Sequence, residues 1–259
     1  RQHPDSNERV PLLLKTLRDA LAKGGPILIP AFSLERTQLM LYELSNFFSA
    51  GELPSLSVYL DSPLAIQVTA LYEKWGREYF KPEAKREIKL EKSIFEFPFL
   101  KKTPTRAESD AIAHDHNPKI IIAGAGMSHG GRIGKHELRY LPDPKTTLLM
   151  VGYQAPGSPG RLLAEGKKRI RFNGQEIPVR ATVKMLQGWS AHADSDELLR
   201  FAESALSKKR PKAIFTALGE PAASRFLAQR IHDSLGARAI VPEKGQVWEI
   251  TKEAVRAMR

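Results

Sequence analysis

The chain has 259 residues, of which 42% are hydrophobic, and its 40 Lys and Arg against 29 Asp and Glu give a net charge of +11. This apolar fraction excludes wholesale disorder, the apolar runs are too short for a membrane helix, and the length suits one large domain or two small ones. The absence of cysteine excludes disulfides and thiolate metal sites and fits a reducing compartment, so we expect a cytoplasmic location. The short apolar runs predict no membrane partner. The positive charge favours a polyanion such as nucleic acid as partner, and an ordinary solvated basic surface is the alternative.

The first half of the sequence alternates helical patterns with short apolar runs. Apolar residues from Val10 to Leu21 share one helical face, with Pro11 in the expected first turn and Gly24 beyond the end. Thr105 and Glu108 have the spacing of a capping box, which predicts a short helix. The charged segment 81–102 predicts no clear element. The other patterns predict helices over 35–48 and 65–80 and strands over 26–30, 56–60 and 119–123.

The second half continues the alternation. Asn173-Gly174 predicts a hairpin turn between strands over 169–172 and 177–186. Gly236 is expected to end a helix that begins at Pro221. Further patterns predict helices over 132–141 and 195–206 and strands over 146–153, 212–216, 239–241 and 246–250. Such alternation predicts an α/β fold with a largely parallel sheet.

Several loops that follow predicted strands could bind an anion. Ligands of open α/β sheets bind at the carboxyl ends of the strands, where helix N-termini and glycine-rich turns offer unpaired backbone N–H groups. Each loop also has a plain structural interpretation, as a helix cap or a tight turn. The segments that contain these loops are 24–38, 61–63, 124–132 and 152–161.

Histidines supply the candidate catalytic groups. His192 precedes a predicted helix and stands near Asp194, where an imidazole could serve as a general acid or base or be merely structural. His136 and His232 are expected on helix surfaces, and His114 and His116 lack nearby partners. No spacing in the chain gives a complete metal site.

Taken in order, six segments resemble the β-CASP branch of the metallo-β-lactamase superfamily, whose members are nucleases of RNA processing. They cover nearly the whole chain. A nucleotide-binding α/β enzyme that uses the turn at 124–131 is a weaker interpretation of the same glycines. The six segments are Gly24–Gln38, Asp61–Ala65, Ile121–Arg132, Leu148–Arg161, Trp189–Asp194 and Gly219–Pro221.

The resemblance implies a fold and a function. Residues 1–8 would be a remnant of a preceding core segment, 9–187 a β-CASP domain with a parallel sheet, and 188–259 the returning C-terminal part of a metallo-β-lactamase core. Family members hydrolyse single-stranded RNA with two zinc ions, and His192 would match the histidine that protonates the leaving oxygen. The substrate-binding positions would be Arg36, Asp61, Ser62, Gly126, Met127, Arg132, Ser158 and Arg161.

The sequence also departs from the family pattern. It lacks the family's His-x-His-x-Asp-His zinc motif, and Leu218 stands where the family has another zinc-ligand histidine. Glu35 and Ser158 replace the usual glycine and threonine. We therefore expect zinc ligands mostly outside this chain, and a fragment or half of a split protein that is inactive alone. A non-catalytic RNA-binding or scaffolding relative is the alternative, and a homodimer or a missing N-terminal half is the expected protein partner.

Overall fold

The computed structural model describes residues 6–80, 82, 85, 93–172, 174–190, 192–208 and 211–258. These residues divide into two units, one up to residue 190 and the other from His192 onward. Each unit is described by itself below.

In the described part of the first unit, six strands form one sheet in the order β3-β2-β4-β1-β5-β8, with every neighbouring pair parallel. The apolar runs of β1 and β4 are buried on both faces, as expected for the centre of a parallel sheet. The α/β class with a parallel sheet is thus confirmed. The strands are β1 Ile27–Pro30, β2 Ser57–Asp61, β3 Leu100–Lys102, β4 Lys119–Ala123, β5 Thr147–Met150 and β8 Thr182–Met185.

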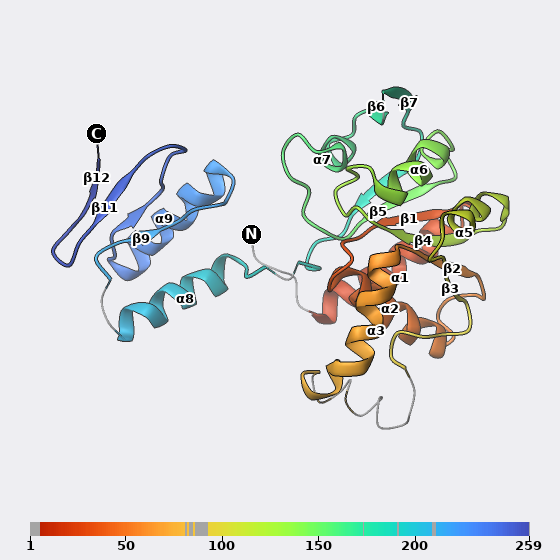
Figure 1. Cartoon of the computed structure of the whole chain (residues 1–259), viewed down its shortest axis with the longest axis horizontal. Helices are drawn as coiled ribbons and strands as arrows, with labels where there is room; N and C mark the ends of the chain where they lie inside the picture. The colour runs from red at the N-terminus through yellow and green to blue at the C-terminus, as the bar shows by residue number, and fades with distance from the viewer. Residues whose placement is uncertain are drawn as a thin grey trace. The chain divides into compact units, whose positions relative to one another are not determined.

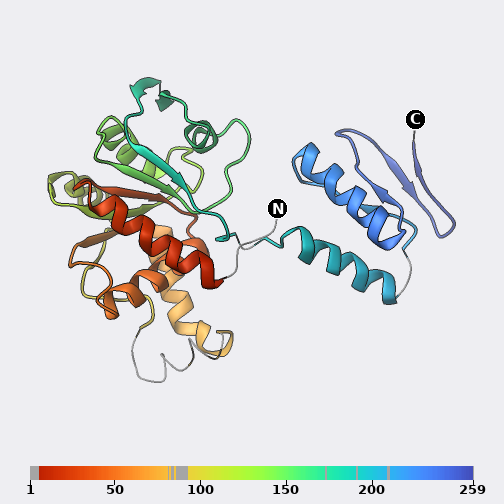
Figure 2. The ribbon, with the colours of Figure 1, turned by 180° about the vertical axis from the view of Figure 1, so that it is seen from behind.

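Helices cover both faces of this sheet (Figures 1 and 2). Helices α1 Ser6–Leu21, α2 Arg36–Ser49 and α3 Pro63–Trp75 pack on one face through a core that includes Leu17, Leu41 and Ile122. On the other face, α6 Gly131–Tyr140 and α7 Pro159–Ala164 pack on Leu28, Ile121 and Leu148. The short α5 Arg106–Ala111 and the 3-10 turn η2 Ile112–His114 complete that face, where Ile112 joins the core.

The chain leaves the sheet at a hairpin of β6 Arg169–Phe172 and β7 Gln175–Pro178, which pair antiparallel. The hairpin is confirmed, although Asn173 of its expected turn lies outside the described residues. The single strand expected over 177–186 is wrong. The chain turns between β7 and β8, where the N–H groups of Arg180 and Ala181 donate to the carbonyl of Leu141 instead of to a strand.

Two helices differ from their expected bounds for local reasons. Helix α1 already begins at Ser6, so Pro11 lies inside it; Pro11 is exposed, and its missing N–H costs the helix one bond on the solvent side. Helix α3 ends at Trp75 and passes into the 3-10 turn η1 Gly76–Glu78. The ring of Phe80 packs directly on Gly76, within 2.2 Å of where a Cβ would stand, which folds the chain back.

The second unit is a small α/β layer. Helices α8 Ser195–Lys208 and α9 Pro221–Leu235 pack around Ala202 and Ile231, and Gly236 caps α9 in the left-handed conformation as expected. Strands β9 Ile214–Phe215 and β10 Ala239–Ile240 pair parallel. Strand β11 Trp248–Ile250 pairs antiparallel with β12 Val255–Ala257, a strand that the sequence patterns did not predict.

Candidate functional site

The carboxyl edge of the six-stranded sheet gathers the predicted substrate-binding residues. Because the strands are parallel, the loops after β1, β2, β4 and β5 emerge at one edge, and α2, α3, α6 and α7 begin there. Seven of the eight positions expected to bind substrate lie in these loops or in the first turns of these helices, and Asp61 is the last residue of β2. The eight positions are Arg36, Asp61, Ser62, Gly126, Met127, Arg132, Ser158 and Arg161.

Two hydroxyls from neighbouring loops meet at the centre of this edge. The Oγ atoms of Ser33 and Ser62 lie 3.3 Å apart, and a Cβ on Gly124 would lie 3.9 Å from each of them. Ser62 also accepts the N–H of Ala65 at 3.3 Å and so caps α3. The hydroxyl pair is therefore held by the helix start.

The glycine-rich loop after β4 owes its glycines to close backbone packing. A Cβ on Gly126 would lie 2.8 Å from the ring of Phe32 and 2.9 Å from its backbone nitrogen. Gly131 has φ +67°, and a Cβ there would lie 2.6 Å from the carbonyl oxygen of Gly124. Met127 is half-buried, and its carbonyl accepts the N–H of Gly160 at 3.1 Å. These contacts fix the loop against both neighbouring loops.

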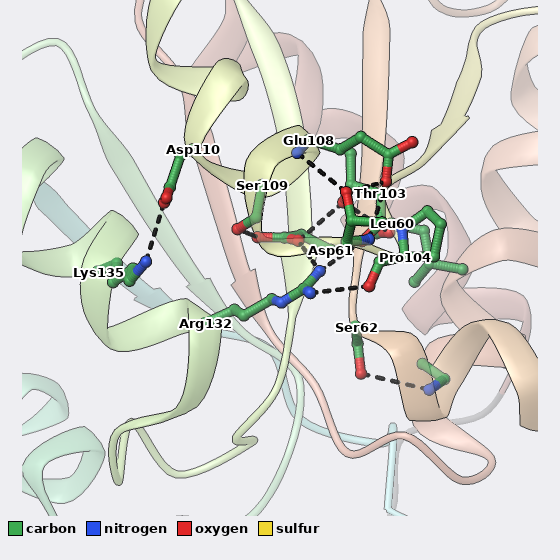
Figure 3. Close-up of polar contacts among 12 residues, drawn as sticks. Leu60, Asp61, Ser62, Thr103, Pro104, Glu108, Ser109, Asp110, Arg132 and Lys135 are labelled. Atoms are coloured by element: carbon green, nitrogen blue, oxygen red, sulfur yellow. Dashed lines mark hydrogen bonds and ion pairs between the residues drawn. The ribbon is translucent and has the colours of Figure 1, made fainter.

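Asp61 forms the centre of a buried polar network (Figure 3). Its Oδ1 accepts hydrogen bonds from Arg132 and Thr103 at 2.7 Å, and its Oδ2 bonds to Ser109 and His136 at the same distance. Burial raises the pKa of Asp61, but the hydrogen bonds from His136, Ser109, Thr103 and Arg132 outweigh it and lower the pKa to about 2. The network ties β2 to α5 and α6.

The network changes the interpretation of two predicted residues. Arg132 directs its guanidinium into the protein, where it also donates to the carbonyls of Thr103 and Pro104 (Figure 3). His136 is only 6% exposed, so the expectation that it lies on the surface of its helix is wrong. A buried carboxylate at the end of β2 is the reason, because an imidazole that pairs with it need not be solvated.

Arg36 is the first residue of α2 and lies mostly inside the protein. Burial lowers its pKa, while Glu35 beside it raises the pKa and Arg9 lowers it further. Within the described residues, the buried Nε of Arg36 has no hydrogen-bond partner. A buried donor without a partner can be satisfied by a ligand such as an anion.

Ser158 and Arg161 lie at the start of α7. Ser158 is almost fully buried and accepts the N–H of Arg161 at 3.0 Å as a helix cap. The guanidinium of Arg161 bonds to Glu165 at 2.7 Å and remains about one-third exposed. The charge of Arg161 is thus partly exposed and paired with Glu165, whereas Ser158 caps the start of α7.

Two residues of this edge escaped sequence reasoning. Gln154 is buried, and its Nε2 donates to the carbonyls of Gly126 at 3.0 Å and Gly152 at 3.1 Å, which joins the loops after β4 and β5. Glu137 is fully buried beneath the glycine-rich loop and accepts a hydrogen bond from Ser128; burial raises its pKa to about 8. Their place on neighbouring loops and helices was visible in the sequence, but their burial was not.

The second unit carries His192 and Leu218. His192 is exposed, and the Oδ1 of nearby Asp194 accepts the N–H groups of Asp196 and Glu197 at 2.9 Å, which caps α8. His232 is exposed on α9, as expected. Leu218 is fully exposed at φ +66°, beside a pocket of about 540 Å³ lined by the loops 216–221 and 241–244.

The described residues do not fit a zinc ion. Across the part of the chain that the structure describes, no three His, Cys, Asp or Glu side chains lie close enough to hold a metal. Leu218 has no donor atom that could coordinate zinc. No chemical step through zinc can be derived from these residues.

Comparison with known proteins identifies the kind of domain. The sequence model of the Beta-Casp domain matches residues 37–163, and that of the Zn-dependent metallo-hydrolase RNA specificity domain matches residues 176–242. No helix among the described residues is both long and apolar enough to cross a membrane.

Relatives named as ribonucleases and as a transcription termination factor are similar to this chain in sequence. The chain is 38% identical to Ribonuclease TTHA0252 of Thermus thermophilus over 77% of its own length and 46% of the relative's. It is 31% identical to an RNase J-like protein of Methanocaldococcus jannaschii over 92% of its length and 53% of the relative's. It is 30% identical to Transcription termination factor FttA of Pyrococcus horikoshii over 89% of its length and 36% of the relative's. The chain thus spans about half the length of the first two relatives.

Proposed function

Because the chain belongs to the β-CASP family of metallo-β-lactamase-fold proteins, we propose that it acts in RNA processing, with the carboxyl edge of its sheet holding single-stranded RNA. The observation that carries this proposal is the set of helix starts at one edge beside the Ser33–Ser62 hydroxyl pair and Arg36. The proposed division is a remnant over 1–8, a β-CASP domain over 9–187 and a returning core part over 188–259.

The electrostatics of this edge suit an RNA backbone. Unpaired N–H groups and the helix dipole make each helix start attractive to phosphate. The carboxylate of Asp61, the acid at the end of β2, is fully occupied by donors and shielded from a ligand. The net charge of +11 adds a long-range attraction for a polyanion. We assign phosphate contacts to Arg36, Ser62, Arg161 and the backbone around Gly126 and Met127. Asp61, Arg132 and Ser158 position these groups.

We further propose that His192 is the general acid for hydrolysis of the RNA phosphodiester bond. An imidazole can hold and release a proton near neutral pH, and the leaving oxygen needs a proton when its bond to phosphorus breaks. His192 is exposed and thus accessible to a substrate. Zinc would activate the attacking water, as the family resemblance implies, and would be held mostly by residues outside those described here.

The test is to compare His192→Ala with His232→Ala in the full-length protein, loaded with zinc. Loss of a general acid reduces the rate of cleavage of end-labelled single-stranded RNA by about 10²–10⁴-fold. We expect this loss for His192→Ala and none for His232→Ala, a change of an exposed helical histidine. Wild-type cleavage by the His192 variant, with an unchanged melting curve, would remove His192 from the mechanism.

Leu218 favours a second function, that of a non-catalytic RNA-binding or scaffolding protein. An exposed leucine occupies the position at which the family resemblance places a zinc-ligand histidine. This function predicts salt-dependent RNA binding without cleavage by the full-length protein, and gain of zinc binding by Leu218→His. Zinc-dependent cleavage by the unaltered full-length protein would exclude it.

We propose that the second unit meets another protein surface. It exposes Leu198, Phe201 and Phe226, large apolar side chains that a monomer in water tends to cover. A second copy of the chain or a further core segment is the proposed cover, and light scattering distinguishes a dimer from a monomer.

A cytoplasmic location is proposed on the cysteine-free composition alone.

A further inference from the structure

Two exposed aromatic rings stand at the polar edge of the sheet. Phe32 follows β1 by two residues and is 44% exposed, and Tyr153 follows β5 by three residues and is 49% exposed. Strands β1 and β5 are neighbours and run parallel, with Ile27 beside Thr147, so both rings belong to adjacent loops of one edge.

Both aromatic residues are anchored to the same glycine loop. The backbone and ring of Phe32 lie so close to Gly126 that a Cβ there would meet both. The carbonyl of Phe32 accepts the hydroxyl of Thr37 at 2.8 Å, which fixes its backbone. On the other side, Gln154, next to Tyr153, donates to the carbonyl of Gly126 at 3.0 Å. The two loops are thus held in place before any ligand arrives.

Exposed rings on a rigid polar edge suit a particular ligand. Proteins that bind unpaired nucleic acid combine a phosphate-binding track with aromatic side chains on which successive bases stack. A base-paired duplex does not present the faces of its bases for such stacking. Phe32 directly precedes Ser33 of the Ser33–Ser62 hydroxyl pair, and Tyr153 lies on the loop after the neighbouring strand. Ser62 and Arg36, on the same edge of the sheet, are assigned above to the phosphates.

We propose that Phe32 and Tyr153 form a stacking platform for unpaired bases, and that this platform makes the edge selective for single-stranded RNA. The inference rests on the proposed function, because it needs the RNA backbone at this edge. It assigns selectivity against duplex to two named rings, whereas the charge and the helix starts attract any phosphate chain.

The experiment measures binding by the whole 259-residue chain to a fluorescent oligoribonucleotide and to the same sugar–phosphate backbone without bases. The variants are Phe32→Leu and Tyr153→Leu, which keep an apolar side chain but remove the flat ring, and Tyr153→Phe, which keeps the ring. Trp75→Leu is the matched control, since Trp75 is 61% exposed at the far end of α3.

Each leucine variant should bind the oligoribonucleotide about tenfold more weakly, the scale of one base stacked on a ring. Binding to the abasic backbone should not change, and neither should the slope of log affinity against log salt, because no phosphate contact is lost. Trp75→Leu should bind as the wild type does, and Tyr153→Phe should recover most of the affinity that Tyr153→Leu loses.

Wild-type affinity in both leucine variants would overturn the platform, as would an equal loss on the abasic backbone. Either outcome leaves the proposed function standing, because RNA binding would persist. Failure of the unaltered chain to bind either probe would overturn the platform and the proposed RNA-binding edge together.

Discussion

At the scale of single residues, Asp61 holds the loops of the sheet edge. A buried carboxylate with good hydrogen bonds tolerates burial, but removal of its charge leaves Arg132 and His136 without their counterpart. We predict that Asp61→Asn lowers the free energy of unfolding of the first unit by about 3 kcal/mol. Denaturant unfolding followed by the fluorescence of buried Trp189 measures it.

Asp110→Asn is the matched control for this change. Asp110 directly follows Ser109 of the network and pairs with Lys135 at 2.9 Å on the surface (Figure 3). Exposed ion pairs add little to stability, so the control should unfold like the wild type. Equal destabilisation by both variants would show that the buried network contributes no more to the free energy of unfolding than the surface ion pair does.

The low pKa of Asp61 gives the same network a pH signature. The folded pKa of Asp61, about 2, lies below its ordinary value of 3.8. The contribution of Asp61 to stability is therefore complete above about pH 4 and is lost as the pH falls toward 2. The difference in unfolding free energy between wild type and Asp61→Asn should therefore shrink between pH 4 and pH 2. A difference that stays constant over this range would contradict the assignment.

Sequence reasoning reached part of this site. It selected Asp61 because ligands of α/β sheets bind at the carboxyl ends of strands, and it took Arg132 from the family resemblance. The structure places both residues at the carboxyl edge of the sheet. It could not show that these two residues bind each other, or that His136, 75 positions from Asp61, bonds to the same carboxylate. Such pairings depend on the packing of α6 against the sheet, which no local pattern encodes.

At the scale of elements, the loop between β9 and α9 contains a strained residue. Leu218 has φ +66°, a conformation that costs a residue with a Cβ about 1 kcal/mol and glycine almost nothing. Since the side chain is fully exposed, its removal loses no packing. Leu218→Gly should therefore stabilise the second unit by about 0.5–1 kcal/mol.

Leu218→Ala isolates the cause of that effect, because alanine loses the same side chain but keeps the Cβ. We expect no gain for alanine. Trp248 reports the unfolding of this unit through its contact with Phe215, whose ring centroid lies 5.3 Å away. Equal stability of the glycine and alanine variants would mean that the loop relaxes without strain.

Most helices and central strands could be predicted from local chemistry. The buried runs of β1 and β4, the capping box at Thr105 and Glu108, and Gly236 after α9 all act through neighbours in sequence. Strands β3 and β12 were missed. Each has three residues and gains its pairing from a partner strand, so its own pattern is weak.

At the scale of the whole chain, the net charge and the family matches both favour RNA as the partner. The net charge of +11 predicts RNA binding that weakens steeply with salt, because each phosphate contact releases counterions. The matches to the Beta-Casp domain and to the Zn-dependent metallo-hydrolase RNA specificity domain agree with RNA as the proposed partner. The zinc expectation stands apart, because the described residues supply no cluster of ligands for it.

The central claim is that this chain binds single-stranded RNA and that its described residues provide no zinc site. One titration tests it most directly. The purified 259-residue chain is mixed with end-labelled single-stranded RNA at several salt concentrations, with added zinc and with chelator, and both binding and cleavage are followed. We predict salt-dependent binding and no zinc-dependent cleavage. Zinc-dependent cleavage would contradict the zinc-site assignment, and an absence of binding at low salt would contradict the RNA-binding edge.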